Sequence, residues 1–402
     1  MEKQSLWNIS YIRMCLGSFF QYLTHYTLLV SLPIFVVQFL KMDENQAGLV
    51  LTFFQVGAVL FRPFAGKWMD DFEKKRVLFV SLGLFCIICF MYLGVQTVFF
   101  LLILRFFHGA GFATGTTATA TMVTVFAPPS RMGEGVGYLA VFTSIAMVIG
   151  PFIGLKLIVD YSFTVLFAVC AVFGLLAFLC GNISSITGKK NKSQITNKET
   201  FSWKDLFEPH ALPIALCGGL LSFVYSSLLG FLPLYARKLG MIDTAGYFFA
   251  VYALAIVLSR PFIGKLFDRI GANVIVYVSV FVYFIGMVVL SQANNPIQFL
   301  LAGAIIGLGF GGLNPSFQTI AVLAAPTHKS GLATSTYFLS MDIGVGVGSF
   351  VLGLVVDYTD YRTMYLICSL VVILIAILFY FTNHRHKNRL GLCQVLRRRQ
   401  NP

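Results

Sequence analysis

The sequence predicts an all-α membrane protein whose twelve transmembrane helices form two pseudo-symmetric six-helix bundles. Three observations lead to this fold class: a composition poor in charge, twelve long apolar runs, and an internal repeat. The chain of 402 residues is 57% hydrophobic and only 11% charged, whereas a soluble protein carries about 25% charged residues. We therefore expect most of its surface to face lipid.

The apolar runs set the number and order of the helices. A membrane helix needs roughly 20 largely apolar residues. Runs of that length lie near 14–40, 46–66, 77–96, 98–126, 134–159, 162–183, 210–236, 246–267, 273–292, 297–325, 331–356 and 362–382. A polar stretch after the sixth run indicates four segments: an N-terminal half at 1–183, a linker loop at 184–208, a C-terminal half at 209–383 and a basic tail at 384–402.

The two halves repeat each other at an offset of 198 residues. Residues 62–67, RPFAGK, recur as RPFIGK at 260–265, and Asp70 recurs as Asp268. Because each half contains an even number of helices, we expect the halves to be parallel repeats about an axis along the membrane normal.

The basic residues predict the orientation in the membrane. Of the 29 Lys and Arg, four lie in loops on the side away from the termini and two lie within predicted spans; the others share the side of the termini and the linker. Basic loops favour the cytoplasm, so both termini are expected inside, with the protein in the cell membrane. Because the net charge of +13 is split into short clusters between apolar runs, a nucleic-acid partner is not expected.

The segment after the second run carries a signature pattern. Gly66, Asp70, Lys74 and Lys75 match the loop written G-x-x-x-D-R-x-G-R-K, although acidic residues replace its first Arg and second Gly. The chain thus resembles the major facilitator superfamily over nearly its whole length, and particularly the drug:proton antiporter-1 branch and efflux transporters of Bacillus-type bacteria. In that family this loop latches the two halves during transport. The resemblance implies a latch or seam role for Arg62, Gly66, Asp70, Lys74, Lys75, Gly264, Asp268 and Arg269.

The fifth run ends in a second family-like motif. Gly150, Pro151 and Gly154 follow Ala146 in a pattern similar to G-x-x-x-G-P-x-x-G, which marks exporting antiporters within the superfamily. Proline removes a backbone donor and can bend the helix, which suits a helix at the moving seam between the halves. A structural kink without directional meaning is the alternative.

The fourth run predicts a cavity lining. Arg105 lies about 10 Å deep, where a cation costs roughly 2.5–3.5 kcal/mol and should face a cavity or a partner. On a helix, Arg105, Phe112, Thr116 and Thr119 share one broad face, with His108 at its edge. Outward snorkelling of Arg105 is the alternative.

Three titratable residues are candidates for proton coupling: Asp342, His25 and His108. Asp342 lies near the membrane midplane on a stripe of small and polar residues in the eleventh run, and Ser144 is its repeat counterpart. His25 lies at a similar depth on the first run. Its neighbours there, Gln21, Tyr22 and Tyr26, are candidates for the cavity lining and substrate contact. The alternatives are structural: Asp342 could hydrogen-bond the second helix across the seam, and each histidine could be a packing residue.

Together these features predict a secondary active transporter that exports a small, partly hydrophobic solute from the cytoplasm by proton antiport and alternating access. The family resemblance implies a central cavity lined mainly by the first, fourth, seventh and tenth helices. The alternative is a proton-linked importer of a sugar or organic acid. A membrane-embedded enzyme or a receptor would need a catalytic constellation or a sizeable soluble domain, and the sequence shows neither.

No cofactor or metal is expected. Cys86 and Cys89 form a CxxC, but within a continuous apolar run and without a second pair. We expect a monomer whose partners are a small-molecule substrate, protons and the lipid bilayer.

Overall fold

The computed structural model describes residues 6–42, 44–182 and 206–400. In these ranges the regular structure is helical, and twelve helices are long and apolar enough to cross a membrane, which confirms the predicted fold class. The first half holds α1 (Ile9–Gln38), α2 (Glu44–Asp71), α3 (Lys74–Met91), α4 (Val98–Phe126), α5 (Met132–Asp160) and α6 (Phe163–Asn182). The second half holds α7 (Leu212–Lys238), α8 (Ile242–Ile270), α9 (Ala272–Ser291), α10 (Pro296–Ala324), α11 (Ser330–Tyr358) and α12 (Tyr361–Gln400).

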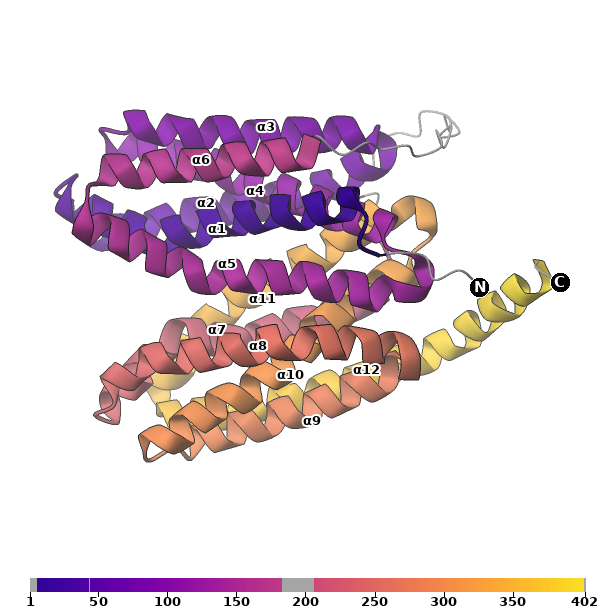
Figure 1. Ribbon diagram of the computed structural model, residues 1–402. Coiled ribbons are helices and arrows are strands. Elements are labelled where there is room, and N and C mark those ends of the chain that lie inside the picture. Colours follow the sequence, from indigo (N-terminus) through magenta and orange to yellow (C-terminus); the bar gives the residue numbers. More distant parts are fainter. Residues whose placement is uncertain (1–5, 43, 183–205, 401–402) are drawn as a thin grey trace.

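The helices form two bundles, with α1–α6 above α7–α12 in Figure 1. The bundles meet mainly where α2 packs against α11 and α5 packs against α8. We call the end at which α1 and α7 begin the terminal end, and the other the opposite end. The ribbons of the two bundles lie closer together at the terminal end (Figure 1).

The repeat is visible in the helix boundaries and caps. Helix α10 begins and ends 198 residues after α4, and α11 does the same relative to α5. The side chains of Thr97 and Asn295, at equivalent positions, cap α4 and α10 by accepting the N–H of Phe100 and Gln298. Such caps satisfy donors that a helix start would otherwise leave unpaired. The two halves therefore share local conformation as well as sequence.

The predicted signature loop is in large part helical, which corrects the prediction. Helix α2 continues through Asp71, and only two residues separate it from α3. In the second half, α8 likewise extends to Ile270 and ends at Gly271, whose φ of 93° favours glycine. Continuing the helix carries Asp70 and Asp268 beyond the apolar runs on a rigid support.

The remaining predicted segments are only partly visible. Of the linker 184–208, residues 184–205 lie outside the described residues. In the tail 384–402, α12 continues beyond its membrane span, which ends at Thr382.

The lateral surface of the bundles is apolar, with Phe99 75% and Ile297 78% exposed. These faces suit contact with lipid.

Candidate functional site

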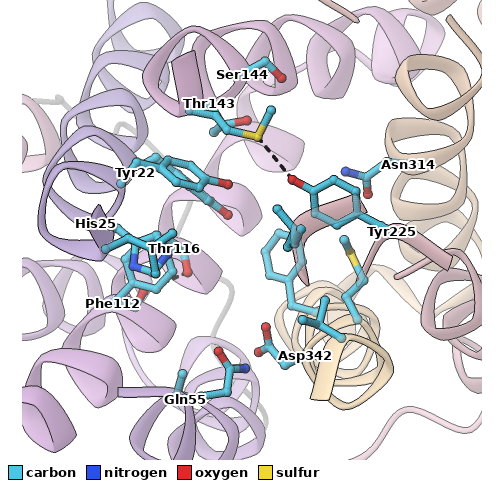
Figure 2. Close-up of a pocket in the computed structure, with 18 of the residues that line it drawn as sticks. Tyr22, His25, Gln55, Phe112, Thr116, Thr143, Ser144, Tyr225, Asn314 and Asp342 are labelled. Carbon is cyan, nitrogen blue, oxygen red and sulfur yellow. Dashed lines mark hydrogen bonds between the residues drawn. The ribbon is translucent and has the colours of Figure 1, made fainter. Parts of the chain in front are cut away.

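A cavity of about 680 Å³ lies between the two bundles. Its wall comes from α1, α2, α4 and α5 of the first half and from α7, α8, α10 and α11 of the second. The wall thus includes the four helices expected from the family resemblance and four more. Figure 2 shows Tyr22 and His25 across the cavity from Tyr225 and Asn314.

The cavity opens toward the opposite end. Among its lining residues, Leu229 and Ser349 lie toward that end of their helices and are exposed. Ala120 and Leu139 line it near the terminal end and are only 2% and 5% exposed. The closed end is therefore the one at which the bundles converge.

Two carboxylates join the halves at the terminal end. Asp70 accepts the backbone N–H groups of Gly331 at 2.9 Å and Leu332 at 2.7 Å, at the start of α11 in the other half. Asp268 accepts those of Gly133 and Glu134, both at 2.9 Å, at the start of α5. Each carboxylate lies where unpaired donors and the helix dipole favour a negative charge.

Glycines bring the paired helices into contact beside these carboxylates. A Cβ atom on Gly66 would lie 2.9 Å from the carbonyl oxygen of Gly331, and one on Gly264 would lie 2.9 Å from that of Gly133. Lys74 reaches Asp70 at 3.6 Å, whereas Lys75 and Arg269 are exposed. The structure therefore places most of the predicted latch residues at the contact between the halves.

Two arginines at equivalent positions form the floor of the cavity. Arg62 on α2 pairs with Asp342 on α11, with 2.5 Å between Nε and Oδ2. Arg260 on α8 instead reaches α5, where it donates to the carbonyl oxygen of Ala140 and to the hydroxyl of Ser144 at 2.7 Å. Both cross-half contacts involve side chains that line the cavity.

Arg105 points inward rather than toward lipid. It is fully buried, donates to the carbonyl oxygen of Val50 at 3.2 Å, and lies 4.3 Å from the centre of the Phe54 ring. His108 lies behind it, 3.3 Å from the guanidinium, and its Nδ1 is 2.9 Å from the Tyr92 hydroxyl. Arg105 lines the cavity, and His108 does not.

His25 lines the cavity between two aromatic rings. Its imidazole stacks on Phe54 and Phe112, with ring centres 4.6 Å and 4.7 Å away. Its buried Nδ1 has no hydrogen-bond partner among the described residues. The stacking fixes the orientation of the imidazole and leaves its Nδ1 without a hydrogen bond.

The other predicted lining residues separate into two groups. Tyr22, Tyr26, Phe112 and Thr116 line the cavity. Gln21 and Thr119 are fully buried outside it. The hydroxyl of Thr119 donates to the carbonyl oxygen of Gly115 within its own helix. The amide nitrogen of Gln21 donates to the carbonyl oxygen of Gly17, but its buried Oε1 has no hydrogen-bond partner among the described residues.

The glycines of the predicted export motif contact α1 of their own half, although α5 itself packs against α8 of the other half. A Cβ atom on Gly150 would lie 3.1 Å from the backbone nitrogen of Thr27, and one on Gly154 would lie 2.8 Å from its carbonyl oxygen. The hydroxyl of Thr27 also donates to the carbonyl oxygen of Gly150 at 3.1 Å. The small residues around Pro151 thus allow α5 to pack closely on α1.

Several cavity residues were not predicted from the sequence. They are polar or aromatic side chains on α2, α7 and α10, namely Gln55, Tyr225, Asn314 and Gln318. Each interrupts an apolar run, which is the one signal that could have indicated them. Figure 2 shows Tyr225 directed at α5, where its hydroxyl lies 3.4 Å from the sulfur of Met147.

Comparison with known proteins identifies the family. The model of the Major Facilitator Superfamily matches residues 14–291 and 242–392. An MFS-type transporter of Methanocaldococcus jannaschii is 26% identical, over 87% of this chain and 92% of the relative. The multi-drug resistance efflux pump PmrA of Streptococcus pneumoniae is also 26% identical, over 80% of this chain and 84% of the pump.

Solved structures agree on the fold. The crystal structure of the MFS transporter FucP in the outward conformation superposes with a TM-score of 0.79 at 18% identity, covering 94% of this chain and 99% of that one. With twelve membrane-spanning helices, a cavity between two repeated bundles and a family match over most of its length, the chain is a multi-pass membrane transporter of the major facilitator superfamily.

Proposed function

We propose that the protein exports a small, partly hydrophobic solute from the cytoplasm across the cell membrane by proton antiport. The observation that carries this proposal is the cavity between the repeated halves, closed at the terminal end by two carboxylate contacts and open at the other. A site at the interface of two repeats that can open on either side is the basis of alternating access. The efflux function named for PmrA supports the direction.

The distribution of basic residues supports a cytoplasmic terminal end. With that orientation the cavity faces outward, which is the state in which an exporter releases its solute and takes up protons. The closed contacts at Asp70 and Asp268 would then be the ones that open to admit solute from the cytoplasm.

Asp342 is the best placed group to link protons to this change. Its carboxylate lines the outward-open cavity and is 20% exposed, so protons from outside can reach it. Protonation would remove its negative charge and release Arg62, which belongs to the other half. The loss of this cross-half pair would favour opening of the terminal end, where the proton is then released.

The histidines are placed differently with respect to this step. His25 lines the cavity and could exchange protons with it directly. His108 does not line the cavity but contacts two residues that do, Arg105 and Phe54, so its effect on coupling would be indirect. The roles proposed for Arg105, Phe112 and Thr116 are contacts with the solute.

The test is proton-driven uptake into everted vesicles of three fluorescent probes: fluorescein, Nile red and ethidium. An imposed pH gradient, acidic inside, should drive accumulation of at least one probe, and Asp342→Asn should abolish the dependence on the gradient. Asp357→Asn is the matched control, because Asp357 is an exposed carboxylate on the same helix. Accumulation that needs no gradient and survives Asp342→Asn would contradict antiport, and probe movement only in the opposite direction would indicate an importer.

A further inference from the structure

The cavity wall has more cationic than anionic side chains. Arg62, Arg105 and Arg260 line it, and among the described lining residues Asp342 is the one carboxylate. Of these three arginines, Arg62 alone has an ion-pair partner in the described part of the chain. The wall therefore carries two more positive charges than negative ones.

Arg260 is the clearer of the two unpaired cations. It is 3% exposed, and one guanidinium nitrogen donates to the neutral Ala140 carbonyl and Ser144 hydroxyl. Its buried Nε has no hydrogen-bond partner among the described residues. The internal repeat explains this: Ser144 occupies the position equivalent to Asp342, so the second arginine lacks the counter-ion that the first one has.

Arg105 also lacks an anion. Its contacts include the Val50 carbonyl, the imidazole of His108 and the face of the Phe54 ring, none of which is an anion. Its second terminal nitrogen is buried without a hydrogen-bond partner in the described structure. A buried cation is costly unless it is paired. Two such cations in one cavity indicate that the missing negative charge arrives with a ligand.

The rest of the wall suits an apolar body. Phe310 stacks on Tyr225 with ring centres 4.9 Å apart, and Tyr22 lies 5.1 Å from the Phe112 ring. These rings line the cavity together with Ser144. An ionised oxyanion matches the planar donor fork of arginine, whereas an ammonium group would be repelled.

We infer that the cavity binds an organic anion, whose carboxylate, sulfonate or phosphate group pairs with Arg260 beside Ser144 while its aromatic or aliphatic body packs against the rings. This inference rests on the proposed transport function and names the class of its solute. It differs from a general preference for hydrophobic compounds, because it requires a negative charge.

The test is ligand stabilisation of the purified full-length protein in nanodiscs, with naphthalene compounds that share one ring system. The anionic probes are 2-naphthoate, 2-naphthalenesulfonate and 2-naphthyl phosphate; the neutral and cationic ones are 2-naphthamide and 2-naphthylmethylammonium. At least one anion should raise the melting temperature at concentrations where the amide and the ammonium compound do not. Potassium chloride at equal concentration distinguishes organic from inorganic anions.

Two variants locate the anion. Arg260→Gln should weaken binding by about tenfold or more, because charge-assisted hydrogen bonds are lost, and Arg260→Lys should retain part of it. Ser144→Asp places a carboxylate beside Arg260, as Asp342 lies beside Arg62, and should abolish anion binding without removing the cation. Arg76→Gln is the control, because Arg76 is an exposed arginine outside the cavity that pairs with Glu73.

Four results would overturn the inference: equal stabilisation by the amide, stabilisation by the ammonium compound alone, an equal effect of chloride, or no effect of any oxyanion. Full anion binding by Ser144→Asp would also do so. Because the measurement is an equilibrium one without a proton gradient, its outcome is separate from that of antiport. Proton-driven export of neutral or cationic probes with no anion binding would leave the proposed function intact and reject the solute class.

Discussion

At the scale of single residues, the molecule uses the same arginine twice in different electrostatic settings. Arg62 and Arg260 are repeat equivalents, and each crosses from one half to the other. One meets a carboxylate and the other a hydroxyl. A pair that includes a titratable group can be switched by a proton, and a pair without one stays cationic at every physiological pH.

The pair of Arg62 and Asp342 leads to a stability prediction. Asp342→Asn should destabilise the protein by about 3 kcal/mol, the low end for removing one partner of a buried pair, because the Asp342 side chain is 20% exposed. The double variant Arg62→Gln with Asp342→Asn should recover much of this loss, since no unpaired charge remains. The melting temperatures of the purified variants measure both effects, and a double variant less stable than either single one would contradict this account.

At the scale of helices, we expect closure of the terminal end to depend on small residues. Gly66 on α2 and Gly264 on α8 each touch backbone of the opposing half. A larger side chain at either glycine must push the two helices apart. The same substitution at a glycine with free space around it would not. We therefore expect substitutions at these contacts to shift the conformational equilibrium.

Gly66→Val should shift the protein away from the state with the open opposite end. The readout is labelling of Ser349→Cys, in a background without the native cysteines, by a membrane-impermeant maleimide added from outside. Labelling should slow, because Ser349 lines the open cavity. Gly230→Val is the control, since a Cβ atom on Gly230 would meet no atom within 4 Å; equal slowing in both variants would count against the glycine contact.

The two latch carboxylates should have similar effects. Asp70→Asn and Asp268→Asn each replace a carboxylate with a neutral amide. Each carboxylate accepts hydrogen bonds from two backbone N–H groups at the start of a helix. Each should weaken closure by about 0.3–1 kcal/mol, and the double variant by about the sum, since the contacts lie on different helix pairs. The same labelling assay reports the change, and a null effect of both single variants would show that the latches do not control closure.

Helix-scale features were also those that sequence predicted best. Hydropathy identified the twelve spans, and the repeat paired Asp70 with Asp268, whose contacts in the structure are equivalent. The signature segment was expected to be a loop because its charges resemble one, yet α2 continues through Asp71. The glycines around Pro151 in α5 pack against α1, because the rotation of α5 about its own axis decides which neighbouring helix they face. Hydropathy does not determine that rotation.

At the scale of the whole molecule, the cavity was harder to predict than the fold. Arg105, Tyr22 and Phe112 were expected in it, and they line it. Gln55 and Asn314 also line the cavity but were not expected there, because a cavity wall is assembled from residues distant in sequence. The lack of a counter-ion for Arg260 could be recognised only once α5 and α8 were placed together.

The unequal charge of the wall also has an electrical consequence. A carrier whose empty cavity changes sides with uncompensated arginines moves charge through part of the membrane field, in which one elementary charge is worth about 2.3 kcal/mol per 100 mV. A bound anion offsets that charge, so voltage should act more strongly on the empty carrier than on the loaded one. Voltage steps applied to solute-free protein should therefore give transient currents. These currents should be smaller in Ser144→Asp, and also smaller in the unmutated protein with a bound anion, because each adds negative charge beside the arginines.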